Sequence, residues 1–175
     1  MVPEVFYSSD DDCIRREDID ETSRMSEEYF GTQTDSSQIP TTQETRAWIY
    51  EHAPKYLNII TSGRRIIGYA FILPCTKKLM KSFTEGKINE FTLFQEIKRA
   101  KFPDVPETLY LCASVLEKKF RGRGLATTAF VKTIKKITHN LREKPVLFYQ
   151  KYSEEGRRLA ERIAEITGLE LRMRR

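Results

Sequence analysis

The 175-residue chain is poor in the residues that build metal and redox sites. It has only three cysteines, Cys13, Cys75 and Cys112, and two histidines, His52 and His139, all far apart in the sequence. No C-x-x-C pair is present, so neither a zinc cluster nor a dithiol redox site is expected. Cys112 lies in an apolar segment, and we interpret it as a packed side chain rather than a catalytic thiol.

Long apolar runs and leader-like patterns are also missing. The longest apolar run, near residues 66–73, falls far short of the roughly 20 residues that a membrane-spanning helix requires. The first residues are acidic and lack the basic-then-apolar pattern of a secretory leader. We therefore expect a cytoplasmic protein that has no membrane partner. With 39% hydrophobic residues, one compact domain over residues 1–175 is expected.

Charge is unevenly distributed along the chain. Residues 1–53 contain 13 acidic and 4 basic residues, a net charge of −9. Residues 54–175 contain 12 acidic and 26 basic residues, a net charge of +14, which favours a polyanionic partner. A nucleic acid is not the expected partner, because no recognisable reading motif is present and the lysines are not interleaved with aromatic residues.

Hydrophobic periodicity and turn residues predict alternating strands and helices. We predict strands over residues 5–7, 56–61, 66–73, 109–116, 144–150 and 169–173. We predict helices from Asp18 or Asp20 to about Phe30, from Thr41 or Thr42 to just before Pro54, and over residues 76–83, 90–100, 127–141 and 153–167. Pro74 is expected to end the strand over residues 66–73.

The most informative segment is a strand that runs into a basic glycine turn, Arg121-Gly-Arg-Gly-Leu-Ala126, which opens onto a helix. The first N–H groups of a helix lack internal partners, and glycines allow close backbone approach, so this arrangement suits a phosphate group. Arg121 and Arg123 add positive charge. The spacing matches neither a P-loop nor a dinucleotide fingerprint. A solvated basic turn before an ordinary helix is the alternative.

The turn resembles the R/Q-x-x-G-x-G/A motif of the GNAT superfamily, the GCN5-related N-acetyltransferases. The chain matches at Arg121, Gly124 and Ala126, and carries an extra glycine at Gly122 and an aromatic residue at Phe120. The hairpin that precedes the motif strand also fits the family pattern.

The resemblance implies an α/β fold of the α+β type, with a mixed, mostly antiparallel central sheet and helices on both faces. It implies acetyl-CoA as co-substrate, no metal, an amine acceptor, and the homodimers that are common in the family. The residues that it assigns to CoA binding are Ser114, Val115, Leu116, Arg121, Gly122, Arg123, Gly124, Leu125, Ala126 and Thr127. The backbone N–H of Leu116 is expected to polarise the thioester oxygen.

The C-terminal part departs from the family pattern N-x-x-A-x-x-L-Y-x-x-x-G-F. With Ala160 aligned to its alanine, Arg157 replaces the asparagine and Ala164 replaces the tyrosine that usually protonates the departing thiolate. Tyr152 and Tyr149 are the candidate substitutes, although each also fits a packed amphipathic side chain. The missing tyrosine supports an alternative function, a non-catalytic acyl-CoA sensor or interaction module.

Residues 76–105 read as an inserted pair of helices separated by Gly86. Phe91, Phe94 and Ile97 are spaced as one apolar stripe of the second helix. The insertion serves either as extra packing or as a wall of the acceptor pocket.

Overall fold

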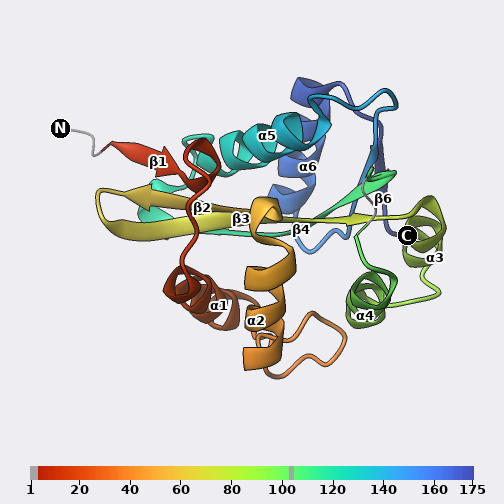
Figure 1. The fold of residues 1–175 in the computed structure, drawn as a ribbon, viewed down its shortest axis with the longest axis horizontal. Helices are drawn as coiled ribbons and strands as arrows, with labels where there is room; N and C mark the ends of the chain where they lie inside the picture. Colours follow the sequence, from red (N-terminus) through yellow and green to blue (C-terminus); the bar gives the residue numbers. More distant parts are fainter. Residues whose placement is uncertain (1–3, 103–104) are drawn as a thin grey trace.

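The computed structural model describes residues 4–102 and 105–175. This part of the chain forms an α/β fold with one six-stranded mixed sheet in the order β1 to β6 and six α-helices (Figure 1). The strands are β1 Val5–Tyr7, β2 Leu57–Ser62, β3 Arg65–Cys75, β4 Thr108–Leu116, β5 Val146–Tyr149 and β6 Leu171–Met173. The helices are α1 Arg16–Phe30, α2 Gln43–His52, α3 Lys77–Thr84, α4 Glu90–Ala100, α5 Leu125–Thr138 and α6 Glu154–Thr167.

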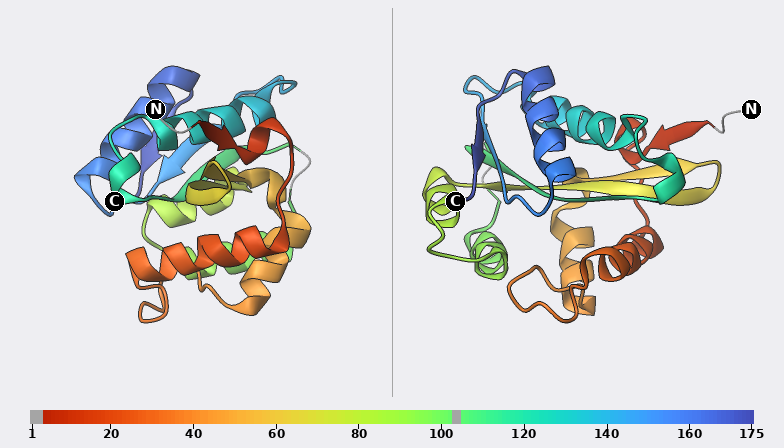
Figure 2. Two further views of the ribbon diagram at one scale, coloured as in Figure 1. Left: turned by 90° about the vertical axis from the view of Figure 1, so that its left-hand side faces the viewer. Right: turned by 180° about the vertical axis from the view of Figure 1, so that it is seen from behind.

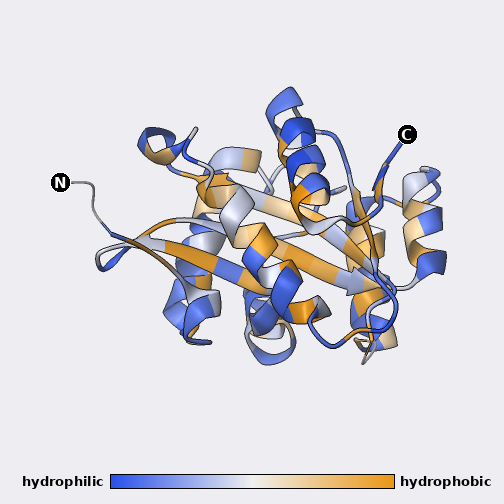
Figure 3. Ribbon diagram, turned by 90° about the horizontal axis from the view of Figure 1, so that it is seen from above, coloured by the Kyte–Doolittle hydropathy of each residue, from blue (hydrophilic) through white to orange (hydrophobic). Residues whose placement is uncertain are grey.

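The sheet is covered on both faces. Strands β1 to β4 pair antiparallel, and β4, β5 and β6 pair parallel. Helices α5 and α6 lie on one face and α1, α2 and α4 on the other, as the two further views also show (Figures 1 and 2). The strands are largely apolar and the helices are polar on their outer sides (Figure 3). Two hydrophobic cores result, one on each side of the sheet.

The predicted helix starts agree with the structure where a side-chain cap is present. Thr42 caps α2 by accepting a hydrogen bond from the N–H of Thr45 at 3.2 Å, and Ser153 caps α6 in the same way. The start of α1 is different: the helix begins at Arg16, before the predicted Asp18 or Asp20. The Asp18 carboxylate instead accepts the N–H of Arg15 at 2.9 Å, which closes a capping box from inside the first turn.

The replacement Thr42→Ala is expected to lower the free energy of unfolding by about 1 kcal/mol, because α2 loses its only side-chain cap. Urea denaturation measures this loss. Gln43→Ala, at the exposed neighbouring position, is the control and should stay within about 0.5 kcal/mol of the wild type. Equal stability of the two variants would show that the cap is unimportant.

Strand β3 continues past the residue that was predicted to end it. Pro74 lies opposite Leu109 in the antiparallel pair with β4, and the strand ends only at Cys75. The pairing of β3 with β2 stops at Phe71, so no described strand lies beside Pro74 on that side. The missing N–H of Pro74 therefore removes no hydrogen bond to such a strand. The prediction was wrong because a proline is tolerated where a strand has lost its partner on one side.

The inserted helices have the predicted positions, and two of the three residues of the predicted apolar stripe are buried. Phe91 is 38% exposed, whereas Phe94 and Ile97 are buried together with Leu93. The inward position next to Phe91 is held by Glu90, a buried carboxyl.

None of the helices within the described residues has both the length and the apolar character that crossing a membrane requires.

Candidate functional site where strands β4 and β5 diverge

Strands β4 and β5 are paired over only part of their length. Thr108–Tyr110 pair with Val146–Phe148, and the rest of β4, residues 111–116, pairs with no described strand on that side. Within β4 the register against β3 shifts between Phe71 and Ile72, which leaves Cys112 as an extra residue. Such a bulge bends a strand and disrupts its ladder. An opening in the sheet therefore begins at the bulge.

The open edge of β4 presents free backbone groups. The N–H of Glu117 donates to the carbonyl of Ile67 in β3 at 2.9 Å. Because hydrogen-bonding direction alternates along an antiparallel strand, the N–H groups of Ser114 and Leu116 point away from β3, toward the opening. The Leu116 carbonyl does so too, since it accepts a hydrogen bond from Nε of Arg121 at 2.9 Å.

The glycine turn meets the opening at the start of α5. Gly122 and Gly124 have φ angles of +76° and +73°, a backbone conformation that glycine adopts without penalty. Gly124 is the N-cap, and its carbonyl receives the first helical bond from Thr128, so the N–H groups of the first turn have no helical acceptor. The first turn contains no acidic residue. Helix α5 begins at Leu125, two residues before the predicted Thr127.

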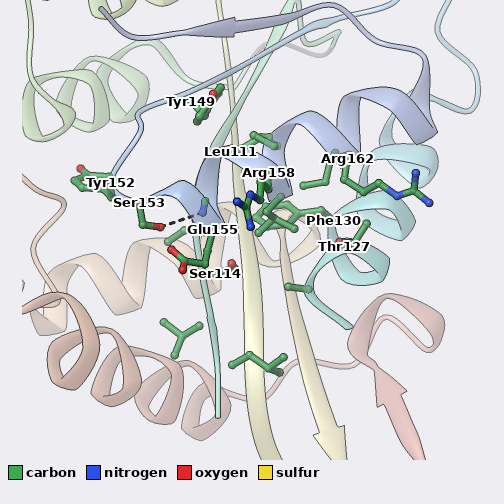
Figure 4. Close-up of a pocket in the computed structure, with 18 of the residues that line it drawn as sticks. Leu111, Ser114, Thr127, Phe130, Tyr149, Tyr152, Ser153, Glu155, Arg158 and Arg162 are labelled. Carbon is green, nitrogen blue, oxygen red and sulfur yellow. Dashed lines mark hydrogen bonds between the residues drawn. The ribbon is translucent and has the colours of Figure 1, made fainter. Parts of the chain in front are cut away.

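A cleft of about 650 Å³ connects these features, and we call it the main cleft. Its walls are the open half of β4, the glycine turn with the start of α5, the segment after β5, and the N-terminal half of α6 (Figure 4). Tyr29 and Phe30 at the end of α1 close one side. This volume is typical of cofactor and ligand pockets.

The structure brings together eleven of the twelve predicted site residues. Those that line the main cleft are Ser114, Val115, Leu116, Arg121, Gly122, Gly124, Leu125, Ala126, Thr127, Tyr149 and Tyr152. Arg123 is not among the lining residues, and its guanidinium lies over the ring of Phe120 at 5.7 Å. The Arg121 guanidinium lies over the ring of Tyr29 at 5.0 Å, so this side chain also fixes the turn against α1.

Two arginines of α6 that the sequence motif did not indicate also line the main cleft. Arg158 and Arg162 are four residues apart and therefore share one face of the helix (Figure 4). Arg162 pairs with Glu165 at 2.8 Å, whereas Arg158 has no carboxylate within ion-pair distance among the described residues. Their spacing was visible in the sequence, but only the tertiary arrangement of α6 beside β4 brings them to the cleft.

The two candidate tyrosines differ in their surroundings. Tyr149 is 5% exposed and belongs to the core beneath α5 and α6, whereas Tyr152 is 51% exposed. Burial raises the pKa of both phenols, and for Tyr152 the nearby Glu90 raises the pKa further. Both hydroxyls therefore stay protonated at neutral pH and can donate a proton or a hydrogen bond.

A second cavity of about 80 Å³ lies on the α1 and α2 side of the sheet, and we call it the Glu90 cavity. It shares Phe30, Cys112, Ala113 and Tyr152 with the main cleft, so the two spaces meet beside the β4 bulge. Sequence reasoning did not identify Glu90 as a site residue, because a carboxyl at the start of a helix is ordinarily read as a solvated charge.

The thiol of Cys112 lies between the two cavities but is a poor nucleophile. It is 3.9 Å from Oε1 of Glu90 and donates to that carboxylate oxygen. Burial and the Glu90 charge raise the pKa of the thiol well above its ordinary value, so the reactive thiolate is scarce. The interpretation of Cys112 as a packed side chain agrees with this environment.

Among the described residues, no group of three or more histidine, cysteine, aspartate or glutamate side chains is arranged to hold a metal ion.

Neither a scan against models of protein families nor a search of curated proteins found a match for this chain.

Proposed function

We propose that this protein is a GNAT-type acyltransferase that moves an acetyl group from acetyl-CoA to a primary amine. The observation that carries the proposal is the main cleft, in which an unpaired strand edge leads directly to a glycine turn and a helix N-terminus. CoA has the matching order of groups, a pantetheine arm with amides followed by a pyrophosphate.

The glycine turn suits the pyrophosphate of CoA. The N–H groups at the start of α5 are free, the helix dipole is positive there, and the two positive-φ glycines leave their backbone uncovered. Arg158 and Arg162 add positive charge to the same cleft. We therefore assign the phosphate end of the co-substrate to this turn and α6, with no phosphate contact assigned to Arg123.

The open edge of β4 suits the pantetheine arm, whose amides can bond to the outward backbone groups of Ser114 and Leu116. Leu116 adjoins the glycine turn, whereas the two cavities meet at Cys112 and Ala113. We take the Glu90 cavity as the acceptor side of the site, so the acyl group is needed where the two cavities meet. We therefore propose the N–H of Ser114, in place of Leu116, as the donor that stabilises the developing oxyanion.

Acyl transfer forms a bond between the neutral amine nitrogen and the acetyl carbon and breaks the bond between that carbon and sulfur. The nitrogen loses one proton as the amide forms, and the sulfur gains one. The departing thiolate takes a proton, and Tyr152 is better placed than Tyr149 to give it, since only Tyr152 borders both cavities. The Tyr152 phenol is protonated at neutral pH, so it can hydrogen-bond to the developing thiolate and pass it the proton.

The replacement Tyr152→Phe is expected to lower kcat by roughly 10- to 100-fold with an unchanged Kd for CoA, because only the proton donor is removed. Release of free thiol from acetyl-CoA measures kcat. Tyr50→Phe, on the outer side of α2, is the control and should keep the wild-type rate. A full rate for Tyr152→Phe with a slow Tyr149→Phe would reverse the assignment.

The proposal as a whole is tested by isothermal titration with CoA and a thiol-release screen over amine acceptors. Binding together with turnover supports a transferase. Binding without turnover for any amine supports a non-catalytic acyl-CoA sensor. Failure of the folded protein to bind CoA would refute both.

A further inference from the structure

The Glu90 cavity has an unusual charge composition. Among the described residues that line it, Glu90 is the only charged side chain, and the others are apolar or neutral hydroxyl and amide groups. Ser26 and Tyr69, whose hydroxyls are 2.5 Å apart, are two of these neutral groups. Among the described lining residues, the cavity therefore holds one carboxyl group and no basic side chain.

The Glu90 carboxyl is buried and forms no ion pair with any residue that the structure describes. Its Oε1 accepts the hydroxyl of Tyr110 at 2.7 Å, and its Oε2 accepts the N–H of Ile39 at 3.2 Å. No lysine, arginine or histidine nitrogen of the described residues lies within 4.0 Å of it. Arg174 acts on its pKa from a greater distance, and donates to the carbonyls of Phe83 and Ile88 instead.

Buried carboxyl groups in proteins are ordinarily paired with a cation or kept neutral by protonation, and a cation that enters the cavity would favour the charged form of Glu90 and pair with it. The geometry points to Glu90 as the group that selects the acceptor by holding its ammonium group, and to a compact primary amine without a carboxylate as the acceptor class. This assignment rests on the proposed acyl transfer, because the cavity meets the main cleft at Cys112, Ala113 and Tyr152.

Size and charge both narrow the acceptor class. A cavity of about 80 Å³ has room for roughly five to eight water-sized groups, which suits a small molecule or the tip of a larger one. A carboxylate on the acceptor would meet the Glu90 charge in a poorly solvated space and be repelled. An uncharged hydroxyl on the acceptor meets no such repulsion and finds hydrogen-bonding partners.

The same carboxyl can prepare the amine for attack. Burial raises the pKa of Glu90. The carboxylate oxygen can therefore take one proton from the bound ammonium, which leaves a protonated Glu90 and a neutral amine. The nitrogen lone pair is then free to form the bond to the acetyl carbon.

The test compares ethanolamine with glycine, two primary amines of similar size and basicity that differ in their hydroxyl and carboxylate groups. The wild type is expected to acetylate ethanolamine with a kcat/KM at least about tenfold higher than that for glycine. Glu90→Gln should lower the value for ethanolamine by roughly 10- to 100-fold with an unchanged Kd for CoA. Glu96→Gln, on the same helix and paired with Arg99, is the matched control and should stay within about twofold.

A readout that needs no CoA separates this inference from the proposed function. Ethanolamine added to the ¹⁵N-labelled protein should shift the amide signal of Ile39, which bonds to Glu90, and the shift should vanish in Glu90→Gln. Equal rates for ethanolamine and glycine, a Glu90→Gln variant with the wild-type rate, or an unshifted Ile39 signal would overturn the role of Glu90. Those results would leave acyl transfer intact. Absent CoA binding with an Ile39 shift would instead refute the proposed function and support the cation site.

Discussion

The replacement Gly124→Asp is expected to weaken CoA binding by more than about 100-fold. The new carboxylate would stand at the N-cap of α5, next to the free N–H groups that are proposed to hold the pyrophosphate. It would repel the phosphates and also occupy those N–H groups as a cap acceptor. Loss of two charge-assisted hydrogen bonds at about 1.5 kcal/mol or more each gives a change of this size.

Gly63→Asp is a closely matched control for this variant. Gly63 lies in the turn between β2 and β3, with a φ of +61° against +73° for Gly124, and a Cβ at either position meets nothing within 4 Å. Both substitutions therefore carry the same left-handed backbone penalty of about 1–2 kcal/mol. Isothermal titration should show normal CoA binding for Gly63→Asp. An equal loss of CoA binding in both variants would show that the effect comes from general destabilisation rather than from the glycine turn.

The second large effect is expected at Asn58, which is completely buried in β2. Its side-chain amide donates to the carbonyl of Ala129 at 3.0 Å and to the hydroxyl of Thr133 at 3.1 Å, both in α5. The amide nitrogen also lies 2.9 Å from Oγ of Ser9, so its two hydrogens are shared among three acceptors, and the amide oxygen accepts the N–H of Ser9 at 3.3 Å. The Asn58 amide therefore connects the sheet, the N-terminal segment and α5, the helix that follows the glycine turn.

The replacement Asn58→Ala is expected to lower the free energy of unfolding by about 3 kcal/mol. It removes several buried hydrogen bonds worth about 1 kcal/mol each and leaves a cavity between β2 and α5. Urea denaturation measures the change, and Asn140→Ala, at an exposed position after α5, should change stability by less than about 0.5 kcal/mol. A loss under 1 kcal/mol for Asn58→Ala would show that the network contributes little.

The local part of the site was predictable from the sequence, because its cause is local. Positive φ angles at Gly122 and Gly124 favour glycine, and the helix that follows needs only the residues after them. The caps Thr42 and Ser153 were predictable for the same reason, since a hydroxyl three residues before a helical N–H is a short-range signal. These features depend on stretches of fewer than about ten residues.

The acceptor side was not predictable, because distant segments create it. Glu90 of α4 meets Ile39 of a loop and Tyr110 of β4, which are 51 and 20 residues away in the sequence. The continuation of β3 through Pro74 likewise depends on where β2 begins to pair. Apolar periodicity favoured Phe91 as an inward residue, and only the packed structure shows that a carboxyl takes the inward position instead.

The central claim is that the open edge of β4 and the glycine turn together hold CoA. A titration of the ¹⁵N-labelled protein with CoA, followed by amide NMR, tests it most directly. Signals of Ser114, Leu116, Gly122, Gly124 and Leu125 should shift together and saturate, while the signal of Gly63, which does not line the main cleft, stays unchanged. Unshifted signals at these five amides at millimolar CoA, or shifts confined to other surfaces, would contradict the claim.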